Sequence, residues 1–292
     1  MKRKVAIFGA GGQLGVELKR EFGERGYQVA AWDRIDVDIT NAPAVESAVG
    51  GLGPEFVVNA AAYNQVDVAE TEPTAAYAVN ALAVRNLALA CRQADAKLIH
   101  FSTDYVFDGR STRPYVETDP THPLGAYAVS KLAGELYAQA YLDHPLVVRT
   151  SGVFGPGGLQ TARGNFIELM LRLARENKPI RVVEDHVASP TYAPALAKCT
   201  ADLAEMKASG VFHVGGGTPI TWYDYAKIIF REAGLAPELR PTNEREYRTA
   251  ARRPRYSALS NGKMEAAGVK SMPSLEIAVR SYLTLRSRLV NL

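Results

Sequence analysis

The chain has 292 residues, of which 47% are hydrophobic and 22% are charged, a balance that excludes an intrinsically disordered protein and fits one large domain or two unequal lobes. Its 34 Lys and Arg residues nearly balance 31 Asp and Glu residues, and the formal net charge of +3 gives no strong field toward nucleic acid or a membrane. The basic N-terminus lacks a signal-peptide pattern and no apolar run reaches the roughly 18 residues that span a bilayer, so we expect a cytoplasmic protein with no membrane or nucleic-acid partner.

Short apolar runs alternate with helix-length segments in the first half of the chain. The predicted strands are Val5–Phe8, Gln28–Trp32, Phe56–Asn59, Lys97–Ser102 and Leu146–Thr150. Two long helices are predicted over 75–94 and 127–141, which are rich in Ala and Leu and contain only one glycine, Gly134. This alternation predicts an α/β fold with a doubly wound parallel sheet, the Rossmann type, whose strands are buried on both faces.

The alternation loosens after about residue 150, where the glycines and proline of 155–158 indicate a loop. Further helices are predicted at about 165–176, 193–206 and 223–233, strands at 180–184 and 211–214, and irregular or edge structure over 237–254. We interpret 1–154 as a nucleotide-binding lobe, completed by the strand near 211–214, and 155–292 mostly as a smaller second lobe. Two cysteines in apolar helical stretches, Cys91 and Cys199, are expected to be buried free thiols.

A glycine-rich loop follows the first predicted strand and opens a helix. Its glycines fit the spacing G-x-x-G-x-x-G at Gly9, Gly12 and Gly15, because position 14, where the common G-x-G-x-x-G pattern has glycine, is Leu14. Glycine permits a tight turn and lets backbone N–H groups approach a pyrophosphate at a helix N-terminus. The loop therefore predicts dinucleotide binding, with a simple tight turn as the alternative.

Asp33 and Arg34 end the second predicted strand, about 20 residues beyond this loop. A carboxylate there can bind the adenosine ribose and favours NAD, whereas the adjacent guanidinium can pair with the 2′-phosphate of NADP. Both NADH and NADPH stay open as cofactors, and a solvated charge pair is the alternative interpretation.

Tyr127 and Lys131 lie four residues apart, so both project from one face of a helix. A phenol has a reference pKa of about 10, and a nearby cation lowers that value toward the working range of an acid or base. Tyr223 and Lys227 match the same spacing. The first pair follows a predicted sheet strand and is predicted to be catalytic, whereas the second is predicted to be an amphipathic surface.

Polar and small residues follow two further strands, where open α/β sheets bind ligands. Thr103 and Asp104 lie at the end of the 97–102 strand, and a hydroxyl there could bind a substrate carbonyl. The small residues of 59–63, which end the 56–59 strand, would let the backbone approach the nicotinamide ribose, or simply pack a helix on the sheet.

Metal binding is not expected, because the five histidines show no ligand spacing with cysteine or carboxylate. A basic cluster near the C-terminal end of the irregular stretch is expected to be a solvated edge, with binding of a substrate diphosphate as the alternative; it comprises Arg248, Arg252, Arg253 and Arg255.

Together these motifs resemble the extended short-chain dehydrogenase/reductases, and among them the dTDP-4-dehydrorhamnose reductases. The matching segments span most of the chain: Gly9–Gly15, Val58–Ala69, Ile99–Phe107, Tyr127–Gly134, Val148–Phe154, Asn165–Ala174 and Thr221–Ala226. The resemblance implies an NAD(P)H-dependent enzyme that reduces the C4 keto group of a dTDP-sugar, dTDP-4-dehydro-6-deoxy-L-mannose, to dTDP-L-rhamnose for cell-surface polysaccharides. A monomer or homodimer is expected.

Residue roles follow from the same resemblance. Tyr127 would donate the proton, Lys131 would lower its pKa and bind the ribose, and Thr103 would bind the carbonyl oxygen, with Asp104 helping to hold the sugar. The cofactor would be lined by Gly9, Gly12, Gln13, Leu14, Gly15, Asp33, Arg34, Asp38, Ile39, Ala61, Ala62, Tyr63, Tyr127 and Lys131.

Gly152 departs from the family pattern, which has a substrate-contacting Trp in the corresponding Arg-Thr-Ser-Trp-Val segment. We expect another side chain, His186 or Phe154, to fill the space beside Gly152. If the space stays open, the sugar ring could turn and give the 4-epimer, dTDP-6-deoxy-L-talose.

Two further functions are compatible with the same fold. One is an epimerase, which would recycle its bound cofactor. The second is a non-catalytic regulatory subunit like the β-subunit of methionine adenosyltransferase, against which intact Thr103, Tyr127 and Lys131 argue.

Overall fold

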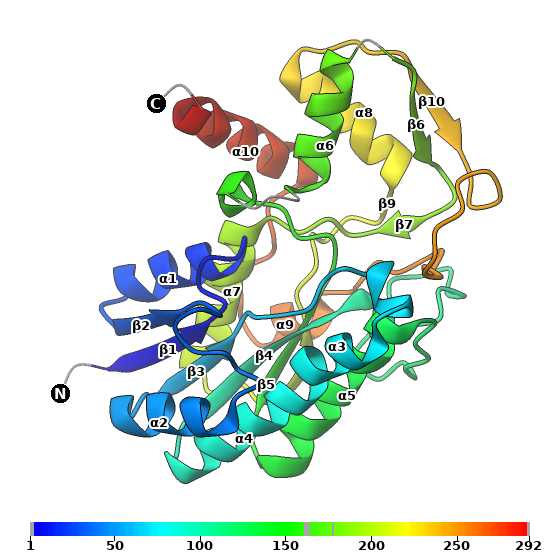
Figure 1. Cartoon of the computed structure of the whole chain (residues 1–292). Coiled ribbons are helices and arrows are strands. Elements are labelled where there is room, and N and C mark those ends of the chain that lie inside the picture. Colours follow the sequence, from blue (N-terminus) through cyan, green and yellow to red (C-terminus); the bar gives the residue numbers. More distant parts are fainter. Residues whose placement is uncertain (1–2, 161–163, 177, 291–292) are drawn as a thin grey trace.

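Six parallel strands form the central sheet of the computed structural model, which describes residues 3–160, 164–176 and 178–290. The strand order is β2-β1-β3-β4-β5-β8. The strands are β1 (Lys4–Phe8), β2 (Gln28–Trp32), β3 (Phe56–Asn59), β4 (Lys97–Thr103), β5 (Leu146–Thr150) and β8 (Gly210–His213). The predicted doubly wound α/β fold is confirmed (Figure 1).

Helices cover both faces of this sheet, and alternate strand residues face the two layers. Val5 and Ile7 of β1 pack on one side, with α1 (Gly15–Glu24), α7 (Ala193–Glu205) and α9 (Gly262–Ala266). Ala6 and Phe8 pack on the other side, with α2 (Ala42–Leu52), α4 (Ala83–Gln93) and α5 (Ala126–Tyr141). Burial on both faces explains why the strands read as continuous apolar runs. Cys91 and Cys199 are buried free thiols in these layers, as predicted.

The single helix predicted over 75–94 is interrupted in the structure. A short helix, α3 (Pro73–Tyr77), passes through a π-helical turn, η2 (Ala78–Leu82), into α4. Such wide turns insert one residue into the helical hydrogen-bond ladder and occur frequently at functional sites. Here the turn carries Asn80, whose side chain is buried against α5.

The second lobe has its own small core. Its two-stranded parallel sheet pairs β6 (Ile180–Val183) with β10 (Leu239–Thr242), so the 237–254 stretch is partly an edge strand and otherwise irregular. Three helices pack with it, α6 (Phe166–Arg175), α8 (Trp222–Ala233) and α10 (Leu275–Val290). A short antiparallel pair, β7 (Val187–Ala188) and β9 (Ile220–Thr221), lies beside α8. The remaining helical turns are η1 (Val68–Glu70), η3 (Asp104–Val106) and η4 (Pro156–Gln160).

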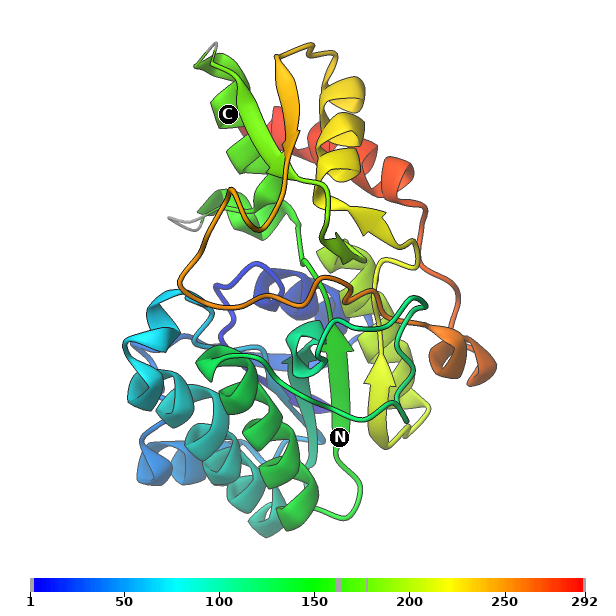
Figure 2. The same ribbon diagram turned by 90° about the vertical axis from the view of Figure 1, so that its right-hand side faces the viewer.

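The chain passes repeatedly between the two lobes. The strand predicted near 211–214 is β8, which pairs with β5 in the first sheet, and α7 packs against α1 although it follows β6 and β7 in the chain. The segment between β10 and α9 crosses back over the junction of the lobes (Figure 2). Along this crossing Val187 N donates to Arg255 O at 2.7 Å, and Tyr115 N donates to Ala258 O at 2.9 Å.

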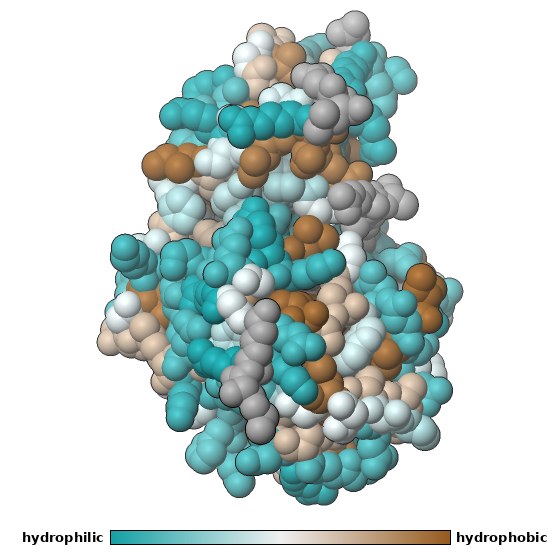
Figure 3. Space-filling model, turned by 90° about the vertical axis from the view of Figure 1, so that its left-hand side faces the viewer, coloured by the Kyte–Doolittle hydropathy of each residue, from teal (hydrophilic) through white to brown (hydrophobic). Residues whose placement is uncertain are grey.

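The face that carries the N-terminal end of the chain is mainly hydrophilic, with apolar residues in separate small groups (Figure 3). Among the described residues, no helix is both long enough and apolar enough to cross a membrane.

Candidate active site

The glycine loop lies at the carboxyl edge of the sheet, where the strand order reverses between β1 and β3. Gly9 has a φ of +76°, and a β-carbon there would lie 2.6 Å from Ala61 N, so only glycine lets this loop approach the residues that follow β3. A β-carbon on Gly15 would clash with Gly9 O. Glycine is therefore required at positions 9 and 15 for the turn itself. This reversal point is where doubly wound sheets bind dinucleotides.

Asp33 hydrogen-bonds to the glycine loop. Gly11 N donates to Asp33 Oδ1 at 2.7 Å, and a β-carbon on Gly11 would lie 2.5 Å from the other carboxylate oxygen. Arg34 is 86% exposed and pairs with Asp38 at 3.3 Å. Hydrogen bonds from Thr40, with Arg34 as a lesser cause, lower the pKa of Asp38. Both predicted ribose-binding charges thus directly follow the end of β2, where the adenosine ribose is bound in this type of sheet.

Gln13 and Ile39, both expected to line the cofactor, also make contacts within the protein. Gln13 Nε2 donates to Val153 O at 2.7 Å, and Gln13 Oε1 accepts from Gly155 N at 3.2 Å and from Asn165 Nδ2 at 3.0 Å. The side chain therefore ties the glycine loop to the start of the second lobe. Ile39 is buried in the core beneath α2 and α4, and its carbonyl oxygen accepts from Asn86 Nδ2 at 3.2 Å.

Asn80 joins the segment after β3 to α5, a role that no sequence pattern predicted. Asn80 Oδ1 accepts from Tyr63 N at 2.9 Å, while its Nδ2 donates to Tyr63 O at 2.9 Å and to Ser130 Oγ at 3.0 Å. Ala61 is half-buried and Ala62 exposed beside this bridge. The only sequence signal for Asn80 is a polar side chain in an Ala-rich helical stretch.

Tyr127 and Lys131 lie on the first turns of α5, as predicted. Lys131 is buried, and its Nζ donates to Phe101 O in β4 at 2.5 Å. Burial lowers the pKa of Lys131 to about 8, with a smaller opposing effect from Glu135. Tyr127 is half-buried, and its ring meets that of Tyr105 edge to face at 6.1 Å. At neutral pH the ammonium is thus charged, fixed in direction and shielded from water.

Thr103 and Asp104 lie where β4 ends and η3 begins. Thr103 Oγ1 accepts from Tyr105 N at 3.2 Å and donates to Asp104 Oδ1 at 3.1 Å, while Ser151 Oγ donates to Asp104 Oδ2 at 2.8 Å. Burial raises the pKa of Asp104 to about 6, against the opposing effect of hydrogen bonds from Ser257, Ser151 and Thr103. The Asp104 carboxylate therefore accepts hydrogen bonds from protein hydroxyls and fixes the orientation of the Thr103 side chain.

A buried ion pair supports this arrangement beneath the sheet edge. Arg149 of β5 donates to Glu135 of α5 through Nη2 at 2.7 Å and through Nε at 2.9 Å. The Ser102 hydroxyl also donates to Glu135, and the Arg149 guanidinium lies 5.3 Å from the Phe107 ring centroid. Ser102 lies between Phe101, whose carbonyl accepts from Lys131, and Thr103. The ion pair of Arg149 and Glu135 therefore helps to fix the end of β4 at which both groups lie. No motif in the sequence predicted this pair.

Pro190 and Trp222 lie nearest to the position of the missing side chain at Gly152. Gly152 has a φ of +51°, and a β-carbon there would lie 3.4 Å from Trp222 Cη2 and 3.3 Å from Pro190 Cα. Phe154 instead packs in the second-lobe core, with its ring 5.5 Å from that of Tyr192. His186 is buried and contacts Asp185 Oδ1 through Nδ1 at 3.2 Å. The atoms nearest to a β-carbon at position 152 therefore belong to Pro190 and Trp222, and not to the two side chains that we named from the sequence.

The arginine cluster divides into paired and exposed members. Arg253 binds Asp67 through two contacts of 2.7 and 3.0 Å and also hydrogen-bonds Tyr105. Arg255 pairs with Glu244 at 2.9 Å, whereas Arg248 and Arg252 are exposed. The second Tyr/Lys match is a surface pair, since Lys227 Nζ lies 4.3 Å from the Tyr223 ring centroid.

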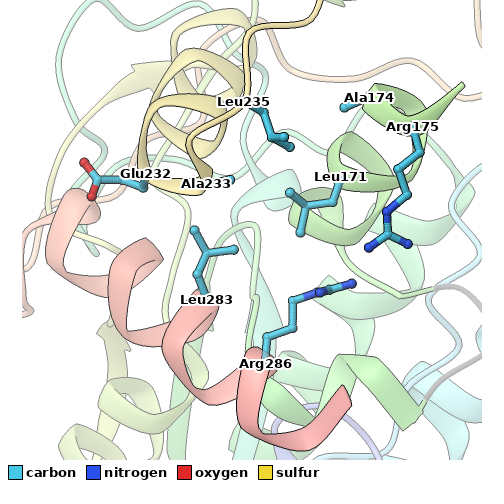
Figure 4. Close-up of a pocket in the computed structure, with 8 residues that line it drawn as sticks. All are labelled: Leu171, Ala174, Arg175, Glu232, Ala233, Leu235, Leu283 and Arg286. Atoms are coloured by element: carbon cyan, nitrogen blue, oxygen red, sulfur yellow. The ribbon is translucent and has the colours of Figure 1, made fainter. Parts of the chain in front are cut away.

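A pocket of about 370 Å³ in the second lobe lies between α6, α8 and α10 (Figure 4). It is lined by Leu171, Ala174, Arg175, Glu232, Ala233, Leu235, Leu283 and Arg286. No predicted site residue is among them, so this pocket is separate from the candidate active site. Within residues 3–160, 164–176 and 178–290, no three His, Cys, Asp or Glu side chains gather to hold a metal ion.

A Rossmann sheet with a glycine loop at its reversal point and a Tyr/Lys pair on the neighbouring helix defines the class: an NAD(P)H-dependent oxidoreductase. Residues 3–287 match the family described as RmlD substrate binding domain, and the chain belongs to this family. It is 37% identical to dTDP-4-dehydrorhamnose reductase of Escherichia coli (strain K12), with 96% of each chain covered. It is also 38% identical to spore coat polysaccharide biosynthesis protein SpsK of Bacillus subtilis (strain 168), with 97% of this chain and 98% of that protein covered.

A solved structure agrees with the sequence relatives. The crystal structure of dTDP-4-dehydrorhamnose reductase from Bacillus anthracis str. Ames, in complex with NADP, matches with a TM-score of 0.92 and 35% identity. The match covers 97% of this chain and 99% of that chain. The similarity thus extends through both lobes.

Proposed function

We propose that this chain reduces the C4 keto group of dTDP-4-dehydro-β-L-rhamnose with NAD(P)H and gives dTDP-L-rhamnose. The observation that carries the proposal is the placement of Thr103 at the end of β4 and of Tyr127 and Lys131 on α5, toward the same carboxyl edge of the sheet as the glycine loop. Relatives that carry the name dTDP-4-dehydrorhamnose reductase, over nearly their full lengths, support the choice of substrate.

The residues at the sheet edge fit a dinucleotide. The glycine loop leads into the N-terminus of α1, where a pyrophosphate is favoured. Asp33 and Arg34 lie where the adenosine ribose would be bound, and the segment 60–63 lies toward the nicotinamide side. When bound, the reduced nicotinamide supplies the hydride that the keto carbon accepts.

The protein side chains handle the oxygen of that keto group. Tyr127 donates a proton to the oxygen as negative charge develops on it, and the Lys131 ammonium, directed by Phe101 O, stabilises the phenolate that results. The Thr103 hydroxyl turns from Asp104 to the substrate oxygen and orients the carbonyl. Ser151 continues to bond Asp104 through the turnover.

A substrate panel tests the proposal. The wild-type protein is assayed with dTDP-, UDP- and GDP-linked 4-keto-6-deoxy sugars, with cofactor oxidation followed by absorbance and the product identified by NMR. Stoichiometric NAD(P)H oxidation with dTDP-L-rhamnose as product supports the reductase. Conversion without net cofactor oxidation would identify an epimerase, dTDP-6-deoxy-L-talose would identify the 4-epimeric product, and no turnover of any dTDP-keto sugar would overturn the assignment.

We further propose a cytoplasmic monomer or homodimer without a nucleic-acid partner. The small net charge of +3 supports the last of these points. Sedimentation at several protein concentrations tests the oligomeric state. Retention on a heparin or DNA column at physiological salt would contradict the absence of a nucleic-acid partner.

A further inference from the structure

Where the end of β5 meets the second lobe, the backbone of Pro190 and the indole of Trp222 fill the space beside residue 152. A β-carbon on Gly152 would already lie 3.4 Å from Trp222 Cη2 and 3.3 Å from Pro190 Cα, and the φ of +51° disfavours any larger residue. A bulky side chain at position 152 and the indole of Trp222 therefore compete for the same volume.

The second lobe fixes this indole firmly. Trp222 is the first residue of α8, and its backbone N donates to His186 O at 3.2 Å. Its ring meets the Phe166 ring edge to face at 4.8 Å and lies 6.0 Å from that of Tyr225. The side chain is nevertheless only half-buried, so part of the indole faces away from this core.

Gly152, beside the indole, is connected to the residues that would handle the keto group. Gly152 follows Ser151, whose hydroxyl donates to Asp104 Oδ2 at 2.8 Å, and Asp104 in turn accepts from Thr103. A path from the indole through Gly152, Ser151 and Asp104 thus leads to the Thr103 hydroxyl. The indole reaches this edge from the opposite lobe.

We propose that Trp222 forms the second-lobe wall of the sugar site and determines which hexose face is presented for reduction. This inference rests on the proposed function. An aromatic face packs well on the C–H groups and methyl group of a deoxy sugar, because both surfaces are apolar. Trp222 is a specificity-determining residue, and it takes the volume that a large residue 152 would otherwise occupy.

Intrinsic fluorescence gives a direct test, because Trp32 and Trp222 are the two tryptophans of the chain. In a Trp32→Phe background, titration with dTDP-L-rhamnose is expected to change the Trp222 emission, whereas dTDP alone leaves it nearly constant. Calorimetry on the same samples measures binding. An unchanged emission at saturating dTDP-L-rhamnose would overturn the inference, whereas failure of dTDP-L-rhamnose to bind at all would count against the proposed function instead.

Kinetics of matched variants give the second test. Trp222→Ala is expected to raise KM for the dTDP-keto sugar by about 10- to 100-fold, while the Kd for NADPH stays within about twofold and the control Tyr223→Ala changes neither. Trp222→Phe should recover most of the loss. Gly152→Trp should lower kcat/KM more in the wild type than in the Trp222→Ala variant, since only the variant has room for an indole at position 152. Equal effects in both backgrounds, or an unchanged KM in Trp222→Ala, would contradict the proposal.

Discussion

Gly134 of α5 lies so close to Asn80 that a β-carbon at position 134 would clash with the Asn80 carbonyl oxygen. The contact presses α5 against the π-helical turn, and this brings Asn80 Nδ2 within 3.0 Å of Ser130 Oγ on the same helix as Tyr127. The absence of a side chain at position 134 is thus a condition for the bridge between Tyr63 and α5.

Gly134→Ala is therefore expected to destabilise the protein although alanine favours helices. Overpacking costs typically about 1–3 kcal/mol, and urea denaturation measures it. Gly50→Ala in α2 is the matched control, because a β-carbon there meets nothing within 4 Å. The control should gain roughly 0.5–1 kcal/mol. Equal stabilisation by both substitutions would show that the contact with Asn80 relaxes without cost.

Tyr127→Phe removes the proton donor and leaves the helix and the cofactor residues in place. General acid catalysis contributes typically about 10²–10⁴-fold in rate, so kcat should fall by a factor within or above this range, while the Kd for NADPH changes little. Tyr223→Phe, at the surface pair on α8, is the control and should keep nearly full activity. Retention of more than half of the wild-type turnover by Tyr127→Phe would remove this phenol from the mechanism.

Asp33 and Arg34 are expected to act in opposite directions on cofactor choice. Loss of one charge-assisted contact costs roughly 1.5–3 kcal/mol, so Asp33→Ala should shift the ratio of kcat/KM values toward NADPH and Arg34→Ala toward NADH. Asp33→Ala also removes the bond from Gly11 N and should weaken both cofactors somewhat. If neither substitution moves the ratio, the 2′-position is recognised by other residues.

The sheet strands could be predicted closely from sequence because burial on both faces leaves a continuous apolar run. Gln28–Trp32, Phe56–Asn59 and Leu146–Thr150 have the predicted bounds. Helix α2 escaped prediction, since its sequence contains Gly50 and Gly51, which oppose a helix locally; packing against α4 outweighs this preference. Helix α10 also was not predicted.

The site was predictable where chemistry follows a strand end and not where it depends on contacts between distant segments. The glycine loop, Asp33, Thr103 and Tyr127 each follow from position within a βα unit. No spacing rule links Gly152 with Trp222 or Glu135 with Arg149, because only the tertiary fold brings these pairs together. The same reason explains why Trp222 was not among the side chains that we expected beside Gly152.

Asp104 predicts a pH dependence of stability. Its folded pKa of about 6 lies above the ordinary value of 3.8, so the folded state binds its proton more tightly than the unfolded state does. The associated stability is complete below about pH 4 and is lost as pH rises through about 6, by on the order of 3 kcal/mol. Relative to Asp104→Asn, the wild type should therefore lose free energy of unfolding across this interval in urea denaturation. Parallel pH curves for the two proteins would refute the raised pKa.

Arg149→Met leaves the Glu135 carboxylate buried without its cation. Breaking one side of a buried pair costs about 3–5 kcal/mol, whereas removing both charges costs much less. The Glu135→Leu/Arg149→Met double variant should therefore unfold at higher urea than Arg149→Met alone. Arg240→Met, which breaks the exposed pair with Glu238, is the control and should cost at most about 1 kcal/mol. A double variant less stable than Arg149→Met would exclude charge burial as the cause.

The return of the chain to form β8 has a consequence for how the protein tolerates cutting. Val147 and Val148 of β5 pair with Val211 and Phe212 of β8. A fragment that ended after residue 154 would expose an apolar strand with free backbone donors and acceptors, which is a template for aggregation with other chains. Adding residues 155–292 as a separate polypeptide would restore solubility only if β8 inserted beside β5 in trans, so the two fragments would need strand complementation to rejoin.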